Sequence, residues 1–361
     1  MVFRSTVKNG PSSHMETHHW QAEKLRLIEQ IHLSNPQPNV VSFESGKGNE
    51  IVVIDERQSL GECHKLWLAL ETLRHKLRGN ALKPGMRVVH RATGSAATTM
   101  AYVCSRLGMP FVAIIPKDLS TYTKQNILSH GGELVMAENA ADAQDIESGY
   151  AIRPGYTVID QYSAEVRALP TQFSPGERML KSTAVAIGRM PSMVVTAVGT
   201  GTTANSVRFA ASDRQLPLDI VGVDVAGGIL SDYLGLNLHG RSDSTHCLEG
   251  ASPGYVPPSF IRTSVDRFQE VHQEAAIAVC HLFRQEFNIE MGPTSGMVMY
   301  GALAELQKMN GRRQGELVAT FCYDHGSRYE ESIFNPAFLK QKGLDIDPWR
   351  GRLEALISDL L

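Results

Sequence analysis

Short runs of apolar residues alternate along this chain with longer segments in which apolar positions recur at helical spacing. Helical spacing predicts helices over residues 20–33, 65–78, 96–107, 121–130, 266–287 and 296–309, and another from about Ala204. The apolar runs predict buried strands over residues 40–43, 51–54, 86–90, 111–116, 133–137, 192–198, 219–225 and 317–323. Continuous apolar strands that alternate with helices are typical of parallel sheets covered on both faces, so the pattern predicts an α/β fold.

The alternation occurs twice, and the two stretches are separated by a cluster of proline and polar residues, LPTQFSP, at 169–175. We therefore expect a flexible N-terminal arm over residues 1–20, an N-terminal α/β domain over 21–168 and a C-terminal α/β domain over 169–361. Each domain is expected to contain a twisted, mostly parallel sheet flanked by helices.

Composition excludes several classes of protein. Of the 361 residues, 42% are hydrophobic and 20% are charged, which is enough apolar material for a full core and argues against disorder. Lys and Arg number 35 against 38 Asp and Glu, so we expect no binding to nucleic acid and none to an anionic membrane. No apolar run approaches the roughly 20 residues of a spanning helix, and the polar N-terminus does not resemble a secretion signal.

Cysteine and histidine usage gives two further expectations. The five cysteines are scattered and include no CxxC pair, which favours reduced thiols and a cytoplasmic location. The 13 histidines form no HExxH motif, so no metal site is expected.

The loop Gly199-Thr200-Gly201-Thr202-Thr203 lies directly after a predicted strand and before a predicted helix. Glycines allow an anion to approach the backbone, and the free N–H groups at a helix start favour phosphate. A tight turn capped by threonine is the alternative interpretation. A dinucleotide fingerprint is incomplete here because position 204 is Ala, and only Asp224 keeps a nicotinamide-dependent dehydrogenase open as a weak hypothesis.

Two more turns rich in small residues open predicted helices. Thr93-Gly94-Ser95-Ala96-Ala97 could hold a carboxylate, and Gly292-Pro293-Thr294-Ser295-Gly296 is the second. Either turn alone is equally consistent with an ordinary helix cap.

The motifs GTGTT (199–203), LEGASPGYVPP (248–258), GPTSG (292–296) and YDHGSRYEESIFNPAFLKQKGL (323–344) occur in that order. This ordered set resembles the β-family, or fold type II, of pyridoxal-phosphate enzymes, which contains cysteine synthase and cystathionine β-synthase. The likeness is greatest to a cysteine desulfhydrase-like branch. It covers roughly residues 35–345 and implies a homodimer with pyridoxal 5'-phosphate in a cleft between its two domains.

The resemblance also implies roles for particular residues. Lys65 would form the Schiff base, and Thr294 would contact the pyridine nitrogen. The residues that would bind the cofactor phosphate are Gly199, Thr200, Gly201, Thr202 and Thr203. Those that would bind the substrate carboxylate are Thr93, Gly94, Ser95 and Ala96, with Ser95 also near the cofactor.

Lys65 is assigned by its spacing, because the run SLGECHK (59–65) shares little with the family beyond the lysine itself. It lies 19 residues before Pro84-Gly85, and the predicted helix between them has the expected length. Lys76 and Lys83 are poorer candidates because they lie late in that helix and in the loop beyond it. A solvated helix lysine is the alternative for Lys65.

The presumed carboxylate loop departs from the family at two positions, with Ser95 in place of Asn and Ala96 in place of Thr or Ser. Ala96 removes a hydroxyl donor. Arg91, just before the loop, is a candidate to supply a compensating cation. Asp324, His325 and Arg328 follow a late strand, at a sheet edge that could face the cofactor, although a purely structural turn is the expectation we favour.

A hydroxyl at the pyridine nitrogen favours loss of a β-substituent over transamination. The resemblance therefore implies β-elimination or β-replacement on a small amino acid such as L-cysteine or an O-activated serine, through an aminoacrylate intermediate. The Lys65 amine would remove the Cα proton. The alternative is a cofactor-binding homologue with little or no turnover that acts as a binding or regulatory protein.

Overall fold

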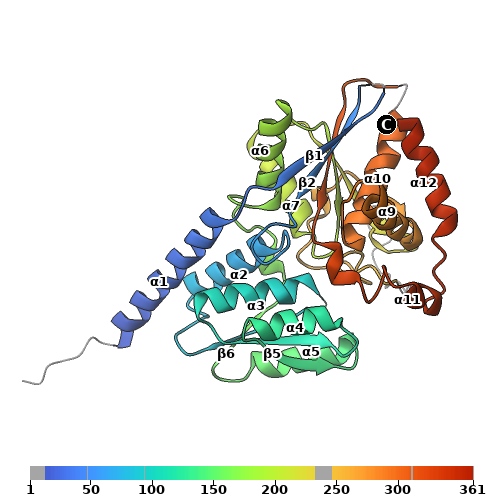
Figure 1. Cartoon of the computed structure of the whole chain (residues 1–361). Coiled ribbons are helices and arrows are strands. Elements are labelled where there is room, and N and C mark those ends of the chain that lie inside the picture. Colours follow the sequence, from blue (N-terminus) through green and yellow to red (C-terminus); the bar gives the residue numbers. More distant parts are fainter. Residues whose placement is uncertain (1–12, 47, 93, 232–245, 310–311, 361) are drawn as a thin grey trace, which may run out of the picture.

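The computed structural model describes residues 13–46, 48–92, 94–231, 246–309 and 312–360. Its α/β architecture consists of two sheets flanked by helices, one of six strands and one of four (Figure 1). All strand pairs in these sheets are parallel except the one at the edge of the larger sheet, so the predicted fold class is confirmed.

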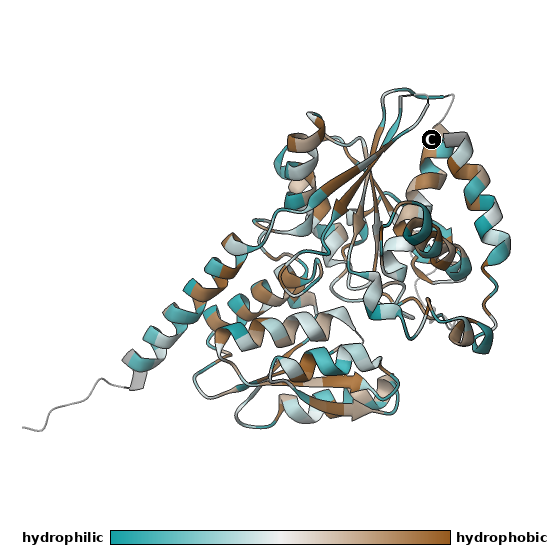
Figure 2. Ribbon diagram, viewed as in Figure 1, coloured by the Kyte–Doolittle hydropathy of each residue, from teal (hydrophilic) through white to brown (hydrophobic). Residues whose placement is uncertain are grey.

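The larger sheet has the strand order β1-β2-β10-β7-β8-β9. In this order its strands are β1 (Asn39–Glu44), β2 (Glu50–Asp55), β10 (Leu317–Cys322), β7 (Met193–Ala197), β8 (Asp219–Val225) and β9 (Arg267–Val271). The three central strands β10, β7 and β8 are almost entirely buried, as expected for apolar strands covered on both faces. Figure 2 shows this hydrophobic centre between more polar helices.

Helices cover both faces of the larger sheet (Figure 1). On one face lie α6 (Pro175–Ile187) and α7 (Thr202–Asp213), and on the other lie α9 (Gln273–Glu286), α10 (Pro293–Met309) and α12 (Asp347–Leu360). A short helix α11 (Pro336–Gln341) precedes α12, and three 3-10 turns occupy Ala164–Val166, Arg262–Ser264 and Gly326–Tyr329.

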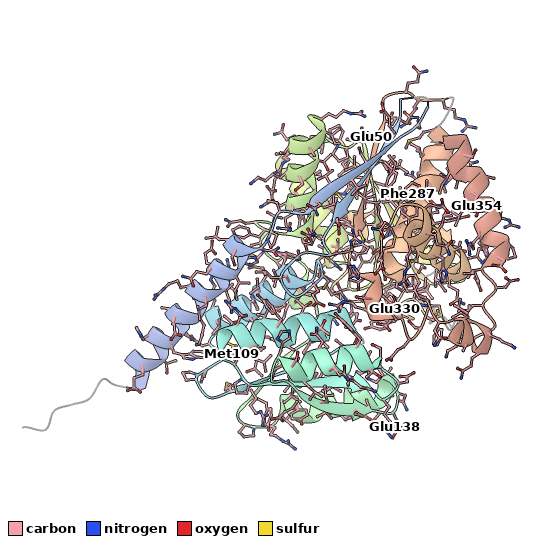
Figure 3. All side chains as sticks on the ribbon, viewed as in Figure 1. Glu50, Met109, Glu138, Phe287, Glu330 and Glu354 are labelled. Carbon is pink, nitrogen blue, oxygen red and sulfur yellow. The ribbon has the colours of Figure 1, made fainter. Side chains whose placement is uncertain are left out.

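The smaller sheet has the order β5-β4-β3-β6, with β5 (Glu133–Ala137), β4 (Phe111–Pro116), β3 (Arg87–Arg91) and β6 (Tyr156–Ile159). One face packs against α5 (Ala140–Ala151). The other face shares a core with α1 (Ser13–Ser34), α2 (Leu66–Arg78), α3 (Ser95–Leu107) and α4 (Thr121–Ser129). Figure 3 shows side chains filling the space between the two sheets, with Glu138 at the far end of the smaller unit.

Two predictions are corrected by the structure. The arm predicted over residues 1–20 is helical from Ser13 onward, because α1 extends seven residues beyond the predicted start; residues 1–12 lie outside the described part. The helix predicted over 266–287 is a strand followed by a helix, since Arg267–Val271 pairs with β8 before α9 begins at Gln273. The strand Arg267–Val271 has the sequence RFQEV, which contains no continuous apolar run. Helical spacing was therefore the stronger local signal for this segment.

The structure also has elements that the apolar pattern did not predict: α5, α6, α11, α12 and β6. In addition, β1 and β2 belong by sequence to the predicted first domain but pair within the larger sheet. The first 168 residues therefore contribute strands to both sheets. The division into domains 21–168 and 169–361 stays a prediction. Within the described residues no helix is long and apolar enough to cross a membrane.

Candidate active site

Lys65 lies immediately before α2, where the chain turns from the larger sheet toward the smaller one. The segment just before it is attached to the segment that follows β10. Cys63 forms an isolated β-bridge with Asp324, and the His64 N–H donates to the Tyr323 carbonyl over 3.3 Å. These bonds place the amine beside the carboxyl end of β10, at the junction of the two units.

A pocket of about 460 Å³, partly open to solvent, surrounds this junction. Its walls are formed by His64, Lys65, Gly94, Ser95, Ala96, Gln161, Tyr162, Glu249, Gly250, Thr294, Tyr323, Asp324 and Tyr329. Burial is the largest influence on the Lys65 amine and lowers its pKa. A lowered pKa increases the neutral fraction of an amine, which is the form able to act as nucleophile or base.

Asp324 is a buried carboxylate on the floor of this pocket. Its Oδ2 atom accepts hydrogen bonds from the Ser95 hydroxyl, over 2.6 Å, and from the Tyr329 hydroxyl, over 2.9 Å. Its Oδ1 atom has no hydrogen-bond partner among the described residues and packs against Gly292, where a Cβ atom would lie 2.2 Å away. Asp324 thus joins α3 to the end of β10. Of the two interpretations of the sequence, the structure favours for Asp324 a position facing the pocket, while Gly326–Tyr329 forms the expected turn.

The turn at the start of α10 packs against Asp324 and forms another part of the pocket wall. The Thr294 hydroxyl donates to the Glu249 carbonyl and lines the pocket, whereas the Ser295 hydroxyl is fully buried and accepts from the Tyr323 N–H. Of the two hydroxyls, Thr294 is therefore the one available to a ligand. Gly250 lies between Thr294 and the lysine: a Cβ atom on it would be 3.6 Å from Thr294 Oγ1 and 4.0 Å from Lys65 Nζ.

Glu249 extends from the same loop to the start of α3. Its Oε2 atom lies 2.6 Å from the point where a Cβ atom on Gly94 would be, so a glycine there makes room for the carboxyl group. No side-chain hydrogen bond joins Glu249 to another residue in the described ranges. Burial is the largest influence on this carboxyl group, and nearby Asp324 adds to it; together they raise the pKa of Glu249 to about 7.

The predicted phosphate loop at 199–203 does not line this pocket but lies directly behind Gly250. A Cβ atom on Gly199 would be 2.2 Å from the Gly250 carbonyl oxygen. Gly201 has φ +81° and precedes the first residue of α7, so a glycine suits its left-handed conformation. The Ser259 hydroxyl donates to the Thr200 carbonyl over 2.6 Å, and the hydroxyls of Thr200 and Thr202 lie 2.8 Å apart.

The structure therefore brings five of the predicted site residues to one pocket, and these are Lys65, Gly94, Ser95, Ala96 and Thr294. Gly199, Thr200, Gly201, Thr202 and Thr203 form the adjoining loop. Thr93 lies outside the described residues. The side chains that the sequence analysis did not assign to the site are His64, Gln161, Tyr162, Glu249, Tyr323, Asp324 and Tyr329. The motifs LEGASPG and YDHGSRY contain four of these residues, but a motif alone does not say which side chain faces the pocket.

Two sequence hypotheses receive a structural correction. Arg91 does not line the pocket, because its Nε donates to Glu147 over 2.9 Å and its guanidinium lies 6.0 Å from the Tyr162 ring. It therefore does not supply a cation to the carboxylate loop. Asp224 accepts N–H groups of Val225 and Leu230 and stabilises the turn after β8. A carboxylate used in this way is not available to a ribose, which argues against the dehydrogenase hypothesis.

The sequence signature of the pyridoxal-phosphate dependent enzyme family matches residues 39–322. This range spans both sheets and contains Lys65, the three small-residue turns and all but three of the pocket-lining residues. The chain therefore belongs to the pyridoxal-phosphate dependent enzyme family, and its cofactor is pyridoxal phosphate.

The chain is 26% identical over 341 residues to L-cysteine desulfhydrase Cds1 of Mycobacterium tuberculosis (strain ATCC 25177 / H37Ra), covering 90% of this chain and 91% of that protein. It is 22% identical over 306 residues to a cysteine synthase of Staphylococcus aureus (strain Mu50 / ATCC 700699), covering 84% and 94% respectively. Both alignments span most of each protein, so the relationship extends over the whole two-sheet architecture.

Solved structures show the same fold. A mutant of a hydrogen sulfide-producing enzyme, complexed with an α-aminoacrylate intermediate, matches with a TM-score of 0.74 at 18% identity, covering 86% of this chain and 92% of that one. O-ureido-L-serine synthase matches with a TM-score of 0.72 at 19% identity, covering 85% and 95%.

The residues of the pocket fit the cofactor. Buried polar atoms on its walls have no hydrogen-bond partner among the described residues, namely His64 Nδ1, Gln161 Oε1 and Asp324 Oδ1. Such atoms are costly unless a polar ligand or water satisfies them. The pocket and its surroundings offer an amine of lowered pKa at Lys65, the pocket-lining hydroxyl of Thr294 and a glycine-rich helix start behind Gly250. These groups suit an aldehyde with a phosphate tail.

Within the described residues, no group of His, Cys, Asp and Glu side chains is arranged to hold a metal ion.

Proposed function

We propose that this chain catalyses β-elimination or β-replacement on a small amino acid, with L-cysteine or an O-activated serine as substrate and desulfhydration of L-cysteine as the favoured reaction. The observation that carries the proposal is Lys65, whose amine is held at the junction of the two sheets with a lowered pKa. Support comes from the family relationship and from the printed activities of the relatives.

Lys65 has two tasks in this proposal. Its amine would hold the cofactor aldehyde, and the free amine would remove the proton from the substrate Cα. The lowered pKa serves both, because each task needs the neutral amine. Bound pyridoxal phosphate supplies the electron sink for the electron pair left at Cα.

The other residues orient the reacting groups. The loop Gly199–Thr203 would hold the phosphate with backbone N–H groups at the start of α7, so a net-acidic chain needs no lysine or arginine there. Thr294 would donate to the pyridine nitrogen in place of the Glu249 carbonyl to which its hydroxyl is bonded here. A hydroxyl does not keep that nitrogen protonated as a carboxylate would, which favours departure of the β-substituent over transamination.

The substrate carboxylate would bind at the start of α3, where Gly94, Ser95 and Ala96 line the pocket. Unpaired N–H groups and the helix dipole favour an anion at this position. Ala96 offers no hydroxyl, so backbone N–H groups carry more of the binding here than in relatives with Thr or Ser.

The test is Lys65→Ala with purified holoenzyme. Wild-type protein should be yellow and should convert L-cysteine to sulfide, pyruvate and ammonia; the variant should lose both the colour and the activity. A matched control is Lys76→Ala, since that amine pairs with Glu165 on the surface. Wild-type protein that is yellow but unreactive toward cysteine, serine, O-acetylserine and O-phosphoserine would instead support the cofactor-binding homologue without turnover.

Three finer features belong to this proposal. We expect a homodimer, as the family resemblance implies, and light scattering of the purified protein tests it. We expect a cytoplasmic location, for which the five free cysteines are the support. We also propose the two domains 21–168 and 169–361, with β1 and β2 of the first contributing to the larger sheet of the second.

A further inference from the structure

We propose that Glu62 is a positioning residue for Lys65. Its carboxylate connects the lysine loop, residues 59–65, to Arg328 and Tyr122, and these three side chains form a clamp that fixes where the lysine enters the pocket. The inference deepens the proposed function and rests on it, because it concerns how the reactive amine is held.

Glu62 has a backbone conformation that its residue type rarely adopts. Its φ is +62°, in the left-handed region, where a Cβ atom crowds the following carbonyl oxygen. Gly61 precedes it with φ +80°, so the chain makes a left-handed turn shortly before Lys65. A glycine at position 62 would adopt this turn without strain. A glutamate there needs side-chain contacts that offset the strain.

The Glu62 carboxylate makes two contacts of this kind. Its Oε2 atom accepts hydrogen bonds from the Tyr122 hydroxyl, over 2.8 Å, and from Nη2 of Arg328, over 3.1 Å. Tyr122 belongs to α4, which shares its core with the smaller sheet, whereas Arg328 lies in the turn after β10 of the larger sheet. One carboxylate oxygen therefore joins the lysine loop to both units.

Arg328 gives this connection a rigid support. The residue is 4% exposed, and its Nη1 atom donates to the Thr98 hydroxyl in α3 over 2.9 Å. Its guanidinium group also lies 5.8 Å from the Tyr122 ring, within the range of a cation–π contact. The planar guanidinium group binds its acceptors in a fixed geometry, so the carboxylate that it contacts is held in place.

The position of Glu62 is passed on to Lys65 through a short, bonded segment. The Glu62 N–H donates to the Ser59 carbonyl over 2.7 Å, and the next residue, Cys63, forms the isolated β-bridge with Asp324. Helix α2 begins directly after Lys65. A shift at Glu62 therefore moves the backbone of the lysine. A misplacement of about 1 Å at a reacting group can cost about 100-fold in rate.

An ordinary surface ion pair is the alternative interpretation of these contacts. The Glu62 side chain is 49% exposed, and pairs between exposed side chains contribute little to stability. Two observations favour the clamp. The side chain of its partner Arg328 is only 3% exposed, and the glutamate lies at a strained backbone position instead of a relaxed one.

The first experiment separates the side chain of Glu62 from its backbone. Glu62→Ala and Glu62→Gly lose the same carboxylate, but only glycine relieves the left-handed strain. Glu62→Gly should therefore melt roughly 2 °C above Glu62→Ala. With L-cysteine, kcat should fall about tenfold in both variants while KM stays within about twofold of wild type. Glu62→Gln keeps an acceptor oxygen and should recover part of the loss.

This division between kcat and KM follows from the two sites involved. The clamp holds the loop of the amine that removes the Cα proton, whereas the proposed carboxylate site lies at the start of α3. A general loss of structure would instead change both parameters and would be greatest in the less stable variant.

Tyr122→Phe tests the clamp from its other side, because it removes one donor without altering the lysine loop. We expect kcat to fall about threefold, and the double variant with Glu62→Ala to be no slower than Glu62→Ala alone, since both changes break the same clamp. Glu330→Ala is the matched control and should leave kcat unchanged. Its side chain is 48% exposed, pairs with Arg284 and lies outside the pocket (Figure 3).

Hydrogen–deuterium exchange of the purified protein tests the clamp without catalysis. The His64 N–H donates to the Tyr323 carbonyl, next to the lysine. It should exchange at least about tenfold faster in Glu62→Ala and Glu62→Gly than in wild type, whereas amides of the distant helix α9 should be unaffected.

Recovery of kcat in Glu62→Gly, in step with its stability, would overturn the positioning role, as would unchanged exchange at His64. Either result leaves the proposed function intact. A wild-type protein that converts none of the candidate amino acids would overturn the proposed function instead. Exchange and melting would then decide by themselves whether Glu62 holds the lysine loop.

Discussion

The turns that open α3 and α7 are alike in sequence but different in environment. Both follow a parallel strand, contain small and hydroxyl residues and begin a helix. The α3 turn, Gly94-Ser95-Ala96, lines the pocket, and the nearest atom to a Cβ on Gly94 belongs to the end of the Glu249 side chain. The α7 turn, Gly199–Thr203, packs against backbone at Gly250 and against Phe260.

This difference matches the tasks proposed for the two turns. A cofactor phosphate stays in place through many turnovers, so its turn can be braced by fixed backbone. A substrate carboxylate must enter and leave in each cycle, so its turn adjoins a flexible side chain. Sequence similarity between two helix starts therefore does not reveal which of them faces the ligand that exchanges.

Substitution of Gly199 should have the largest effect. In Gly199→Ala, the new Cβ would lie 2.2 Å from the Gly250 carbonyl oxygen, so backbone must shift. We expect a loss of roughly 1–3 kcal/mol in the free energy of unfolding, together with weaker retention of the cofactor. Chemical denaturation and absorbance per mole of protein measure the two effects. A variant with wild-type stability and colour would show that this turn is not rigid.

Removal of the Ser95 hydroxyl should have an intermediate effect. Ser95→Ala leaves the Asp324 carboxylate with the Tyr329 hydroxyl as its remaining donor. A hydrogen bond to a charged group contributes about 1.5–3 kcal/mol, so we expect kcat/KM to fall by about tenfold or more. Steady-state kinetics test this, with Ser129→Ala as a control because that exposed hydroxyl only caps a helix turn. An unchanged kcat/KM would show that the hydrogen bond between Ser95 and Asp324 does not contribute to the reaction.

Gly94→Ala should have a smaller effect than Gly199→Ala, which makes it the sharpest test of the comparison. Gly94 has φ 170°, an extended conformation open to any residue, and its new Cβ would meet only Glu249 Oε2 at 2.6 Å. The carboxyl group can move, so we expect stability to change by less than about 0.5 kcal/mol and KM to change by only a few-fold. A loss of stability as large as that of Gly199→Ala would remove the distinction between the two turns.

Arg91→Ala should have the smallest effect on catalysis. The guanidinium pairs with Glu147 outside the pocket, so KM should stay within about twofold of the wild-type value. The cost in stability should be about 1–3 kcal/mol, because the buried Glu147 carboxyl group loses its partner. A severalfold rise in KM would restore the sequence-based hypothesis that Arg91 binds the substrate carboxylate.

The sequence predicted the parts of this protein that depend on local pattern. Buried strands such as Met193–Ala197 consist of continuous apolar residues, and the turns after them are marked by glycine. Arg267–Val271 was missed because an edge strand is specified by its neighbour β8 rather than by its own residues. Lys65 was placed by spacing within an ordered set of motifs, and the structure puts it in the pocket with Thr294.

Glu249 and Asp324 could not be assigned from the sequence for a different reason. They lie 75 residues apart, in segments whose individual motifs do not state which side chain points inward. Their properties arise only when the two loops meet beside Lys65. There, burial raises the pKa of Glu249, and a hydrogen bond from Ser95 holds the Asp324 carboxylate in place. Convergence of this kind depends on tertiary structure and leaves no periodic signal.

The pairing of β2 with β10 has a consequence for biosynthesis. It aligns residues 50–55 with residues 317–322, so the centre of the larger sheet cannot form until almost the whole chain has left the ribosome. Lys65 follows β2 and is positioned by residues that follow β10. Nascent chains interrupted before that strand would therefore leave the edges of β2 and β7 unpaired and their apolar side chains exposed. Such chains would lack the reactive centre and would be expected to bind chaperones.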